Sequence, residues 1–442
     1  MPTTVAPDPA GVRRLLEPHL LIDGYDLVLD LAESSGAWLT DALTKRRYLD
    51  LFSFFSSAPL GHNPPCIRND PQFLEHLAGV AATKPSNPDV CSEPYATFVD
   101  TFARVLGDPQ LPHYFFIDGG ALAVENALKA AFDWKAQRLG ISGPAVNDLQ
   151  VLHLENAFHG RSGYTLSLTN TEVAKTALFP QFSWPRIAAP AVRHPFATYR
   201  ASTIEAEERA VEQAVRAFDA AGDKIACFIA EPIQGEGGDN HFRPEFLQAI
   251  QQLCREREAL FILDEVQTGC GMTGTAWAYQ QLGLEPDIVA FGKKTQVCGV
   301  MAGRRIDEVP ANVFAVSSRI SSTWGGNLTD MVRATRLLET IERDHIFDSV
   351  VKVGDYLLGE LQDLALRHPE QLSNPRGRGL MCAIDLPDTV LRDRVLATMF
   401  SRHQVIALAC GPRGLRFRPP LTITPEEIDH GLAALQQSLN DR

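Results

Sequence analysis

The chain has 442 residues, of which 45% are hydrophobic and 21% are charged, as in an ordinary globular enzyme with two or three structural units. Its formal net charge of -13 argues against nucleic acid or an anionic membrane as a general partner. The eight cysteines form no CxxC pair and have no zinc-ligand spacing, and no apolar run approaches the ~18 residues that span a bilayer. These features predict a cytoplasmic protein with reduced thiols and no metal site.

The first 70 residues are expected to form a loose entry with one short amphipathic helix within residues 1–20, followed by a small antiparallel sheet. Residues 26–31 and 48–55 carry clustered or alternating apolar side chains on either side of the turn Leu43-Thr44-Lys45. The segment 56–65 is rich in Pro, Gly and Ser and follows as a loop, which either lines a pocket or is a plain surface loop.

A strand followed by glycines is the first candidate binding feature. Helices are expected from Pro71 and over residues 95–106, and then a strand over 113–117 that ends in Asp118-Gly119-Gly120 and leads into a helix. Glycines let backbone amides approach an anion closely, and a helix N-terminus offers unpaired N–H groups. The junction therefore suits a phosphate group, with an ordinary capped turn as the alternative.

Two later strands end in loops with charged residues. The strand 150–154 is followed by Phe158-His159-Gly160-Arg161, where the phenylalanine could stack on a ligand ring and the arginine could bind a carboxylate. A core phenylalanine and a surface arginine are the alternative interpretation. The strand 225–230 leads into a Gly-rich loop that presents Glu236, which is either functional or an exposed loop charge.

Two short apolar runs, each ending in a charged residue, organise the chain. Residues 259–263 lead to Asp264, and residues 288–291 lead to Gly292 and Lys293. Such runs predict strands that are buried on both faces, joined here by a helix-length connection. A carboxylate for the ring nitrogen and a lysine for the Schiff base are what pyridoxal phosphate (PLP) requires of a protein. For either residue alone, a turn cap or a solvated lysine is the alternative.

Alternating strands and helices between about residues 110 and 300 predict an α/β fold, with a mostly parallel sheet covered by helices on both faces. We assign residues 71–330 to this large domain. A long helix from about residue 328 to 344 is expected to lead out of it. Residues 331–442 are expected to form a smaller α+β domain, and the N-terminal segment 1–70 is expected to be part of it.

The segment 269–274 matches the GxGxxG pattern of dinucleotide-binding proteins. However, it begins five residues after Asp264 instead of directly after a strand, and no acidic residue follows at the distance that a ribose requires. The sequence has no GxxxxGK[ST] segment for a nucleotide hydrolase and no GxSxG elbow. A nicotinamide-dependent oxidoreductase stays as the alternative from a different enzyme class.

Four motifs follow one another along the chain. They are Gly119-Gly120-Ala121, Asp264-Glu265-Val266-Gln267, Gly292-Lys293 and Ser322-Thr323-Trp324-Gly325-Gly326-Asn327. In this order they resemble the class-III, fold-type-I PLP-dependent aminotransferases, and the similarity spans the chain from about residue 22. The resemblance implies a large domain with a seven-stranded sheet and a homodimer with a shared active site.

The resemblance also implies that Lys293 forms the Schiff base with PLP and moves a proton between the substrate carbon and the cofactor. We choose it over Lys294 because the family places this lysine six residues after the aspartate that opens the strand, here Asp287. In addition, side chains on adjacent residues of extended chain point in opposite directions. The role of Lys294 is left open.

The other cofactor contacts that the resemblance implies are Asp264 at the ring nitrogen, Val266 and Phe158 on the ring faces, Gln267 at the ring hydroxyl, Gly120 and Ala121 at the phosphate, and Thr323 of a neighbouring subunit at the same phosphate.

Within the family, segments such as FHGRSGYT, EPIQGEGGD and RFRPPLT are most similar to members that act on the ε-amino group of L-lysine, with 2-oxoglutarate as the acceptor. Arg161 would then hold the α-carboxylate of lysine, and Arg416 would bind the glutamate carboxylate next to the reacting carbon. Glu236 would neutralise Arg416 when lysine binds, and Asn327 is placed with these substrate-binding residues. Ornithine, acetylornithine and 4-aminobutyrate are the alternative amino donors.

Overall fold

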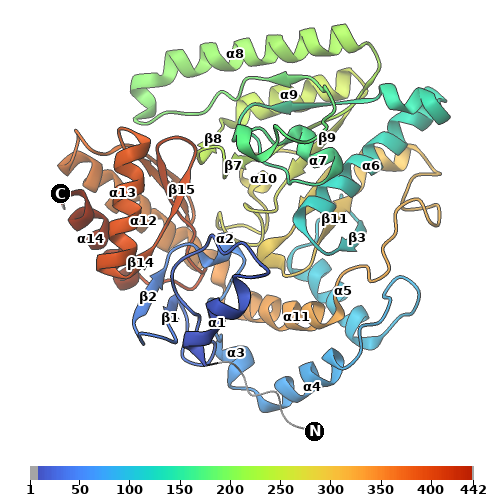
Figure 1. Ribbon diagram of the computed structural model, residues 1–442. Helices are drawn as coiled ribbons and strands as arrows, with labels where there is room; N and C mark the ends of the chain where they lie inside the picture. The colour runs from blue at the N-terminus through green and yellow to red at the C-terminus, as the bar shows by residue number, and fades with distance from the viewer. Residues whose placement is uncertain (1–7, 441–442) are drawn as a thin grey trace.

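A seven-stranded sheet forms the centre of the computed structural model, which describes residues 8–440 (Figure 1). Its strand order is β3-β11-β10-β9-β6-β4-β5, and β11 runs antiparallel to both of its neighbours while the other pairs are parallel. The expected α/β fold with a mostly parallel, seven-stranded sheet is therefore confirmed. The strands are β3 (His113–Ile117), β4 (Gln150–Leu154), β5 (Arg186–Ile187), β6 (Ile225–Ala230), β9 (Leu260–Asp264), β10 (Ile288–Phe291) and β11 (Cys298–Ala302).

Helices cover both faces of this sheet because the strands are apolar on both sides. In β6, Phe228 and Ala230 belong to a hydrophobic cluster that includes α8 and α9, whereas Cys227 and Ile229 belong to a second cluster that includes α6. In Figure 1, α8 and α9 lie together at the top of the view, apart from α6. These helices are α6 (Gly120–Leu139), α8 (Phe196–Ala221) and α9 (Pro244–Glu256).

The two ends of the chain meet in a three-stranded sheet, in which β2 (Arg47–Asp50) pairs antiparallel with β1 (Trp38–Thr40) and parallel with β14 (Val405–Ile406). A separate sheet has the order β12-β13-β16-β15. In Figure 1 the red C-terminal elements accordingly lie beside the blue N-terminal strands. The C-terminal elements are α12 (Ile346–Arg367), β12 (Ser373–Arg378), β13 (Met381–Asp385), α13 (Thr389–His403), β15 (Leu408–Cys410), β16 (Gly414–Phe417) and α14 (Pro425–Asn440).

The long helix α11 (Leu328–Arg343) packs against α4 (Pro71–Ala81) and α5 (Glu93–Val105). The division of the chain at residues 70 and 330 stays a prediction. Within residues 8–440, no helix has the length and apolar character needed to cross a membrane. The shorter helices are α1 (Pro9–Leu16), α2 (Ser53–Ser56), α3 (Pro65–Arg68), α7 (Gly163–Leu168) and α10 (Ala278–Gln281).

The predicted N-terminal sheet is partly wrong. The strand partner of β2 is the three-residue β1, while the expected strand over 26–31 contributes only an isolated bridge between Leu29 and Asp41. Residues 1–7 of the expected entry segment lie outside the described residues. The apolar run after β2 does not continue as a strand either, because residues 53–56 take φ values of 40, 52, 57 and 72° and form a left-handed turn. Nothing in the apolar pattern indicates such a turn.

The connection between β9 and β10 is long enough for a helix, as expected, but most of it is irregular. It contains only α10, four residues long, and otherwise consists of turns. Its three glycines lie against neighbouring side chains, since a Cβ on Gly269 would come within 2.4 Å of Trp277 and one on Gly271 within 2.3 Å of Phe347. The GxGxxG segment is thus a packing feature and offers no open loop for a dinucleotide.

Candidate active site

A cavity of about 1050 Å³ lies at the carboxyl ends of β9 and β10, where open α/β sheets bind their ligands. Its floor includes Asp264, the last residue of β9, and Lys293, which follows β10. The left-handed turn and the loop after it contribute another wall, which includes Phe54 and Phe55. Of the two alternatives for the loop over residues 56–65, the structure shows the pocket-lining one, because residues 57–58 and 61–64 all line this cavity.

Of the two adjacent lysines, Lys293 lines the cavity and Lys294 does not. The Nζ of Lys294 is buried and donates to Ser56 Oγ at 2.9 Å and to the Gln267 carbonyl at 2.8 Å. The expectation of an extended chain at this point is wrong, because Lys293 has a φ of 55° and begins a 3₁₀ turn. The two side chains nevertheless reach different surroundings.

Burial affects the charge of both amino groups. Burial, together with the positive charges of Arg416 and Arg418, lowers the pKa of Lys293 to about 8. Burial likewise lowers the pKa of Lys294 to about 7. A neutral amine, which is the nucleophilic form of lysine, is thus accessible at Lys293 near neutral pH.

Asp264 is fixed in orientation by two hydrogen bonds. Its Oδ1 accepts from the Val266 amide at 3.1 Å, and its Oδ2 lies 2.8 Å from Nδ1 of the buried His159. With the carboxylate ionised, Nδ1 of the histidine carries the proton that is shared with Asp264. The arrangement holds a negative charge at the cavity floor, as a protonated pyridine nitrogen requires.

The part of the cavity wall at the start of α6 suits a phosphate. The first two residues of α6, Gly120 and Ala121, line the cavity, and the N-terminus of this helix has no side-chain cap. Gly119 before them has a φ of 101°, and a Cβ on Gly120 would lie 3.0 Å from Val266 Cγ1. The uncapped N-terminus of a 20-residue helix, with glycines that allow close approach, forms an anion site. The residues present therefore fit PLP.

Three further predicted cofactor residues, Phe158, Val266 and Gln267, also line this cavity. The backbone amide of Phe158 donates to Glu231 Oε1 at 2.9 Å. Gln267 Oε1 accepts from Arg418 Nε at 2.9 Å, which leaves the amide NH2 group of Gln267 to donate elsewhere. An aromatic ring, a branched aliphatic side chain and an amide are thus brought together around one space.

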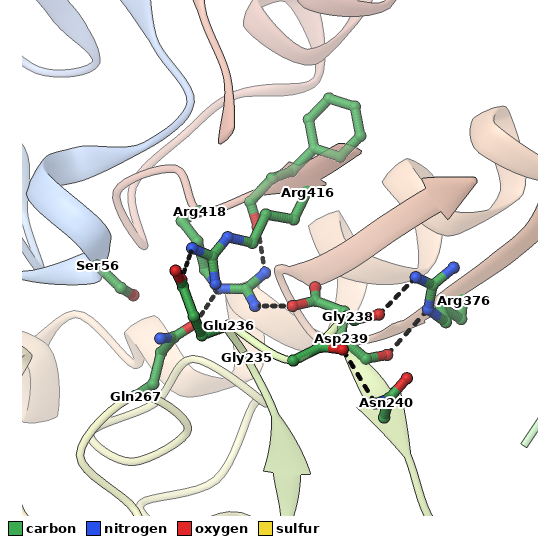
Figure 2. Close-up of polar contacts among 12 residues, drawn as sticks. Ser56, Gly235, Glu236, Gly238, Asp239, Asn240, Gln267, Arg376, Arg416 and Arg418 are labelled. Carbon is green, nitrogen blue, oxygen red and sulfur yellow. Dashed lines mark hydrogen bonds and ion pairs between the residues drawn. The ribbon is translucent and has the colours of Figure 1, made fainter. Parts of the chain in front are cut away.

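Glu236 lines the cavity, and its carboxylate points toward Arg416 (Figure 2). Its Oε2 is 2.7 Å from Arg416 Nη2, and its Oε1 is 2.7 Å from Lys175 Nζ. Burial by itself would raise the pKa of Glu236, but the charges of Arg416 and Lys175 outweigh this effect and hold the pKa below its usual range. Arg416 is only 2% exposed, and its Nε and Nη1 have no hydrogen-bond partner among the described residues. Arg416 could therefore bind the carboxylate of a ligand if Glu236 moved away.

The remaining predicted site residues are placed differently. Arg161 lines the cavity, is exposed, and makes no ion pair with any residue from 8 to 440. Thr323 lies on an exposed loop and is not part of the cavity wall of its own chain. Asn327 is the N-cap of α11, where its Oδ1 accepts from the Thr329 amide at 3.0 Å. The roles of Thr323 and Asn327 stay predictions.

Several residues at the site were not singled out from the sequence. Glu231 directly follows the apolar strand β6, just as Asp264 ends the apolar strand β9. A charge at the end of a buried apolar run could therefore have identified Glu231 from the sequence as well. Burial, reinforced by the charge of Asp264, raises the pKa of Glu231 to about 7. His159 is part of the loop that follows β4, whereas Lys175 lies in a segment with no pattern that indicates a site.

The chain is similar to known proteins along nearly its whole length. The family described as aminotransferase class-III matches residues 23–439. A protein of Amycolatopsis lactamdurans named L-lysine-epsilon aminotransferase is 69% identical over 99% of this chain and 97% of its own length. A 4-aminobutyrate aminotransferase of Dictyostelium discoideum is 30% identical over 93% of this chain and 85% of its own length. The solved structure of a lysine aminotransferase from M. tuberculosis in the internal aldimine form has a TM-score of 0.94 at 57% identity, with 98% of this chain and 99% of that chain covered.

Proposed function

Because the chain belongs to the class-III aminotransferases and is a PLP-dependent enzyme, we propose that it transfers the ε-amino group of L-lysine to 2-oxoglutarate. The products are 2-aminoadipate 6-semialdehyde and glutamate, formed in two half-reactions with ping-pong kinetics. The 69% identity to an L-lysine-epsilon aminotransferase supports lysine as the donor. The observation that carries the proposal is the Glu236–Arg416 pair beside the cavity, because lysine and glutamate place different demands on that arginine.

PLP supplies an electron sink that stabilises negative charge on the substrate carbon. Lys293 would hold the cofactor covalently and, as a neutral amine, would accept the proton from that carbon. Asp264 would keep the ring nitrogen protonated, and His159 holds Asp264 in orientation through the 2.8 Å contact. Phe158 and Val266 line the same cavity and would contact the two faces of the ring. Gln267 would contact the ring hydroxyl, and Gly120 and Ala121 would contact the phosphate.

The two substrates differ in where they carry negative charge. Lysine reacts at its ε-carbon and has no carboxylate there, so its α-carboxylate needs a separate cation. Arg161 lines the cavity and is that candidate, since it makes no ion pair with the residues that the structure describes. Glutamate and 2-oxoglutarate have a carboxylate next to the reacting carbon, and Arg416 binds it in a bidentate manner. A buried arginine left without an anion is costly, so Arg416 needs another partner when lysine is bound.

Glu236 is that partner. It pairs with Arg416 while lysine is bound and turns away when glutamate brings its own carboxylate. Replacing Glu236 with alanine should lower kcat/KM of the lysine half-reaction by at least about tenfold, because an unpaired buried charge costs several kcal/mol. The glutamate half-reaction should fall less or improve. Single-turnover stopped-flow absorbance with each amino donor measures both values, and an unchanged lysine half-reaction would rule out the switch.

We also propose a cytoplasmic homodimer in which Thr323 of one subunit contacts the cofactor phosphate bound by the other. The exposed position of the Thr323 loop, away from the cavity of its own chain, supports this arrangement. For Asn327, which ends the same loop and caps α11, we propose a contact with the substrate. The eight cysteines are all free, as expected of a protein in a reducing compartment.

The donor is tested by a half-reaction screen. The purified enzyme is mixed with lysine, ornithine, acetylornithine or 4-aminobutyrate, and loss of the cofactor absorbance is followed in a stopped-flow instrument. We expect lysine to have the highest kcat/KM of the four. A higher value for any of the other donors would contradict the proposed substrate while leaving the enzyme class unchanged.

A further inference from the structure

The loop that carries Glu236 is held by hydrogen bonds to its backbone carbonyls. Residues 235–239 join β7 (Ile233–Gln234) to β8 (Asn240–His241), and the carbonyl of every residue in the loop accepts a hydrogen bond. The donors are the Asp239 amide to Gly235 at 3.2 Å, the Gly411 amide to Glu236 at 2.9 Å, Asn240 Nδ2 to Gly237 at 3.3 Å, Arg376 Nη2 to Gly238 at 2.6 Å and Arg376 Nε to Asp239 at 2.9 Å.

The loop also has little space in which to move. A Cβ on Gly235 would lie 2.4 Å from Gln267 Oε1, and one on Gly237 would lie 2.0 Å from the carbonyl oxygen of Asn156. By contrast, the side chain of Glu236 is 26% exposed and faces the cavity. Movement between the two substrate states is therefore restricted to the side chain of Glu236, and the backbone of the loop serves as its fixed support.

Arg376 provides much of this support from outside the active site. It lies in β12, is only 3% exposed and does not line the large cavity. Besides the two loop carbonyls, its Nη1 donates to the Asn374 carbonyl at 2.8 Å, and its Nη2 is 2.8 Å from Asp385 Oδ1. Figure 2 shows it on the side of the loop opposite to Arg416. The planar guanidinium thus ties the loop to the four-stranded sheet.

A second arginine, Arg418, holds the same loop by pairing with the carboxylate of Asp239. It also donates to Gln267, which lines the cavity, so its replacement would disturb the cofactor site directly. Arg376 has no such contact and can be changed without touching a residue of the cavity floor. It therefore separates support of the loop from binding of the cofactor.

We propose that Arg376 is a positioning residue for substrate choice. By fixing the carbonyls of Gly238 and Asp239, it holds Glu236 at the place from which its carboxylate reaches Arg416. The inference rests on the switch proposed above, and it adds that the switch works by rotation of one side chain on a rigid loop. Arg416 lies on β16, and both β16 and the Arg376 strand β12 pair with β13. The same sheet therefore carries Arg416 and the arginine that fixes the Glu236 loop.

The test compares lysine and glutamate half-reactions of the holoenzyme in four proteins: the wild type, Arg376→Lys, Glu236→Ala and the double variant. A lysine side chain keeps the charge near Asp385 but cannot contact both loop carbonyls in the same geometry. We expect Arg376→Lys to lower the ratio of kcat/KM for lysine to that for glutamate by about tenfold, because small displacements of a positioned group are costly. In the Glu236→Ala background the same change should alter the ratio by less than about twofold.

Two matched variants strengthen the comparison. Asp385→Asn removes the charge partner of Arg376 and should lower the ratio in the same direction by a smaller factor. Arg378→Lys is the control, because Arg378 lies in the same strand but donates to Gln281 and not to the loop. Its ratio should stay within about twofold of the wild-type value, as expected for an independent site.

The outcomes are distinguishable. Equal losses for lysine and glutamate in Arg376→Lys would show a merely structural role and overturn the inference. If Arg376→Lys changed the lysine-to-glutamate ratio of kcat/KM to the same extent with and without Glu236, Arg376 would not act through Glu236. This result would also overturn the inference. A lysine half-reaction that is unaffected by Glu236→Ala would instead contradict the proposed switch itself.

Discussion

Lys293 and Lys294 are neighbours in sequence, but their surroundings give them different tasks. Lys293 lines the cavity, and burial together with the charges of two arginines lowers its pKa to about 8. Lys294 makes hydrogen bonds to Ser56 and to the Gln267 carbonyl, which ties the left-handed turn to the cavity floor. One of the two adjacent amines is thus placed for reaction and the other for structural support. We therefore expect a different property to depend on pH for each lysine.

For Lys293 the prediction concerns the rate of cofactor attachment. Only the neutral amine reacts, so the rate at which apoenzyme combines with PLP should rise about tenfold per pH unit up to about pH 8 and then level off. Stopped-flow absorbance over a pH series measures it. A rate that keeps rising to pH 10 would indicate an ordinary lysine, and Lys293→Ala is the control that abolishes the signal.

For Lys294 the prediction concerns stability. Its pKa in the folded chain, about 7, is below the value of about 10.4 in the unfolded chain. Between these pH values the unfolded chain binds one more proton, so stability rises with pH by up to ~1.4 kcal/mol per unit. In Lys294→Met this contribution is absent, and the free energy of unfolding in urea should depend less on pH between 7 and 9. Parallel pH profiles for the two proteins would contradict the assignment.

At the scale of elements, the phosphate end depends on how the loop after β4 meets the start of α6. Gly160 has a φ of 121°, and a Cβ there would lie 2.5 Å from Ala121 Cβ. Gly160→Ala should therefore weaken PLP affinity by about tenfold or more, as strain of about 1–3 kcal/mol implies. Gly163→Ala is the control, since its nearest neighbouring atom would be 3.6 Å away. Titration of apoenzyme with PLP tests both, and equal affinities would refute the argument.

The elements also differ in how well the sequence predicts them. β6, β9 and β10 were predictable because an uninterrupted apolar run closed by a charge is typical of a strand buried on both faces. The three-residue β1 and the left-handed turn at residues 53–56 were not, because the first is too short for a pattern and the second is held by distant contacts. One of these contacts is the hydrogen bond from Ser53 Oγ to the Arg418 carbonyl.

At the scale of the whole molecule, the site joins residues from distant parts of the chain. Glu236 and Arg416 are 180 positions apart, and Lys175 lies in a third segment. The roles of the first two could be inferred from the resemblance to a family. The contact of Lys175 with Glu236 and the support from Arg376 could not, because no local pattern records which segments the fold brings together. The sequence therefore indicated the chemistry better than it indicated the supports around it.

The shared site predicts complementation between subunits. A mixed dimer of one Thr323→Ala subunit and one Lys293→Ala subunit contains one site with Lys293 from the first chain and an intact Thr323 from the second. Half of the wild-type activity per mixed dimer should therefore appear at PLP concentrations too low for the Thr323→Ala dimer. If Thr323 acted within its own chain, the mixture would recover no high-affinity site.

The central claim, a covalent link between PLP and the amine at position 293, is tested most directly by borohydride reduction of the holoenzyme followed by peptide mass mapping. Reduction fixes the cofactor on the lysine that holds it. We predict that the cofactor mass is found on Lys293 and that Lys294 in the same peptide is unmodified. A modified Lys294, or a peptide without the cofactor mass, would contradict the account.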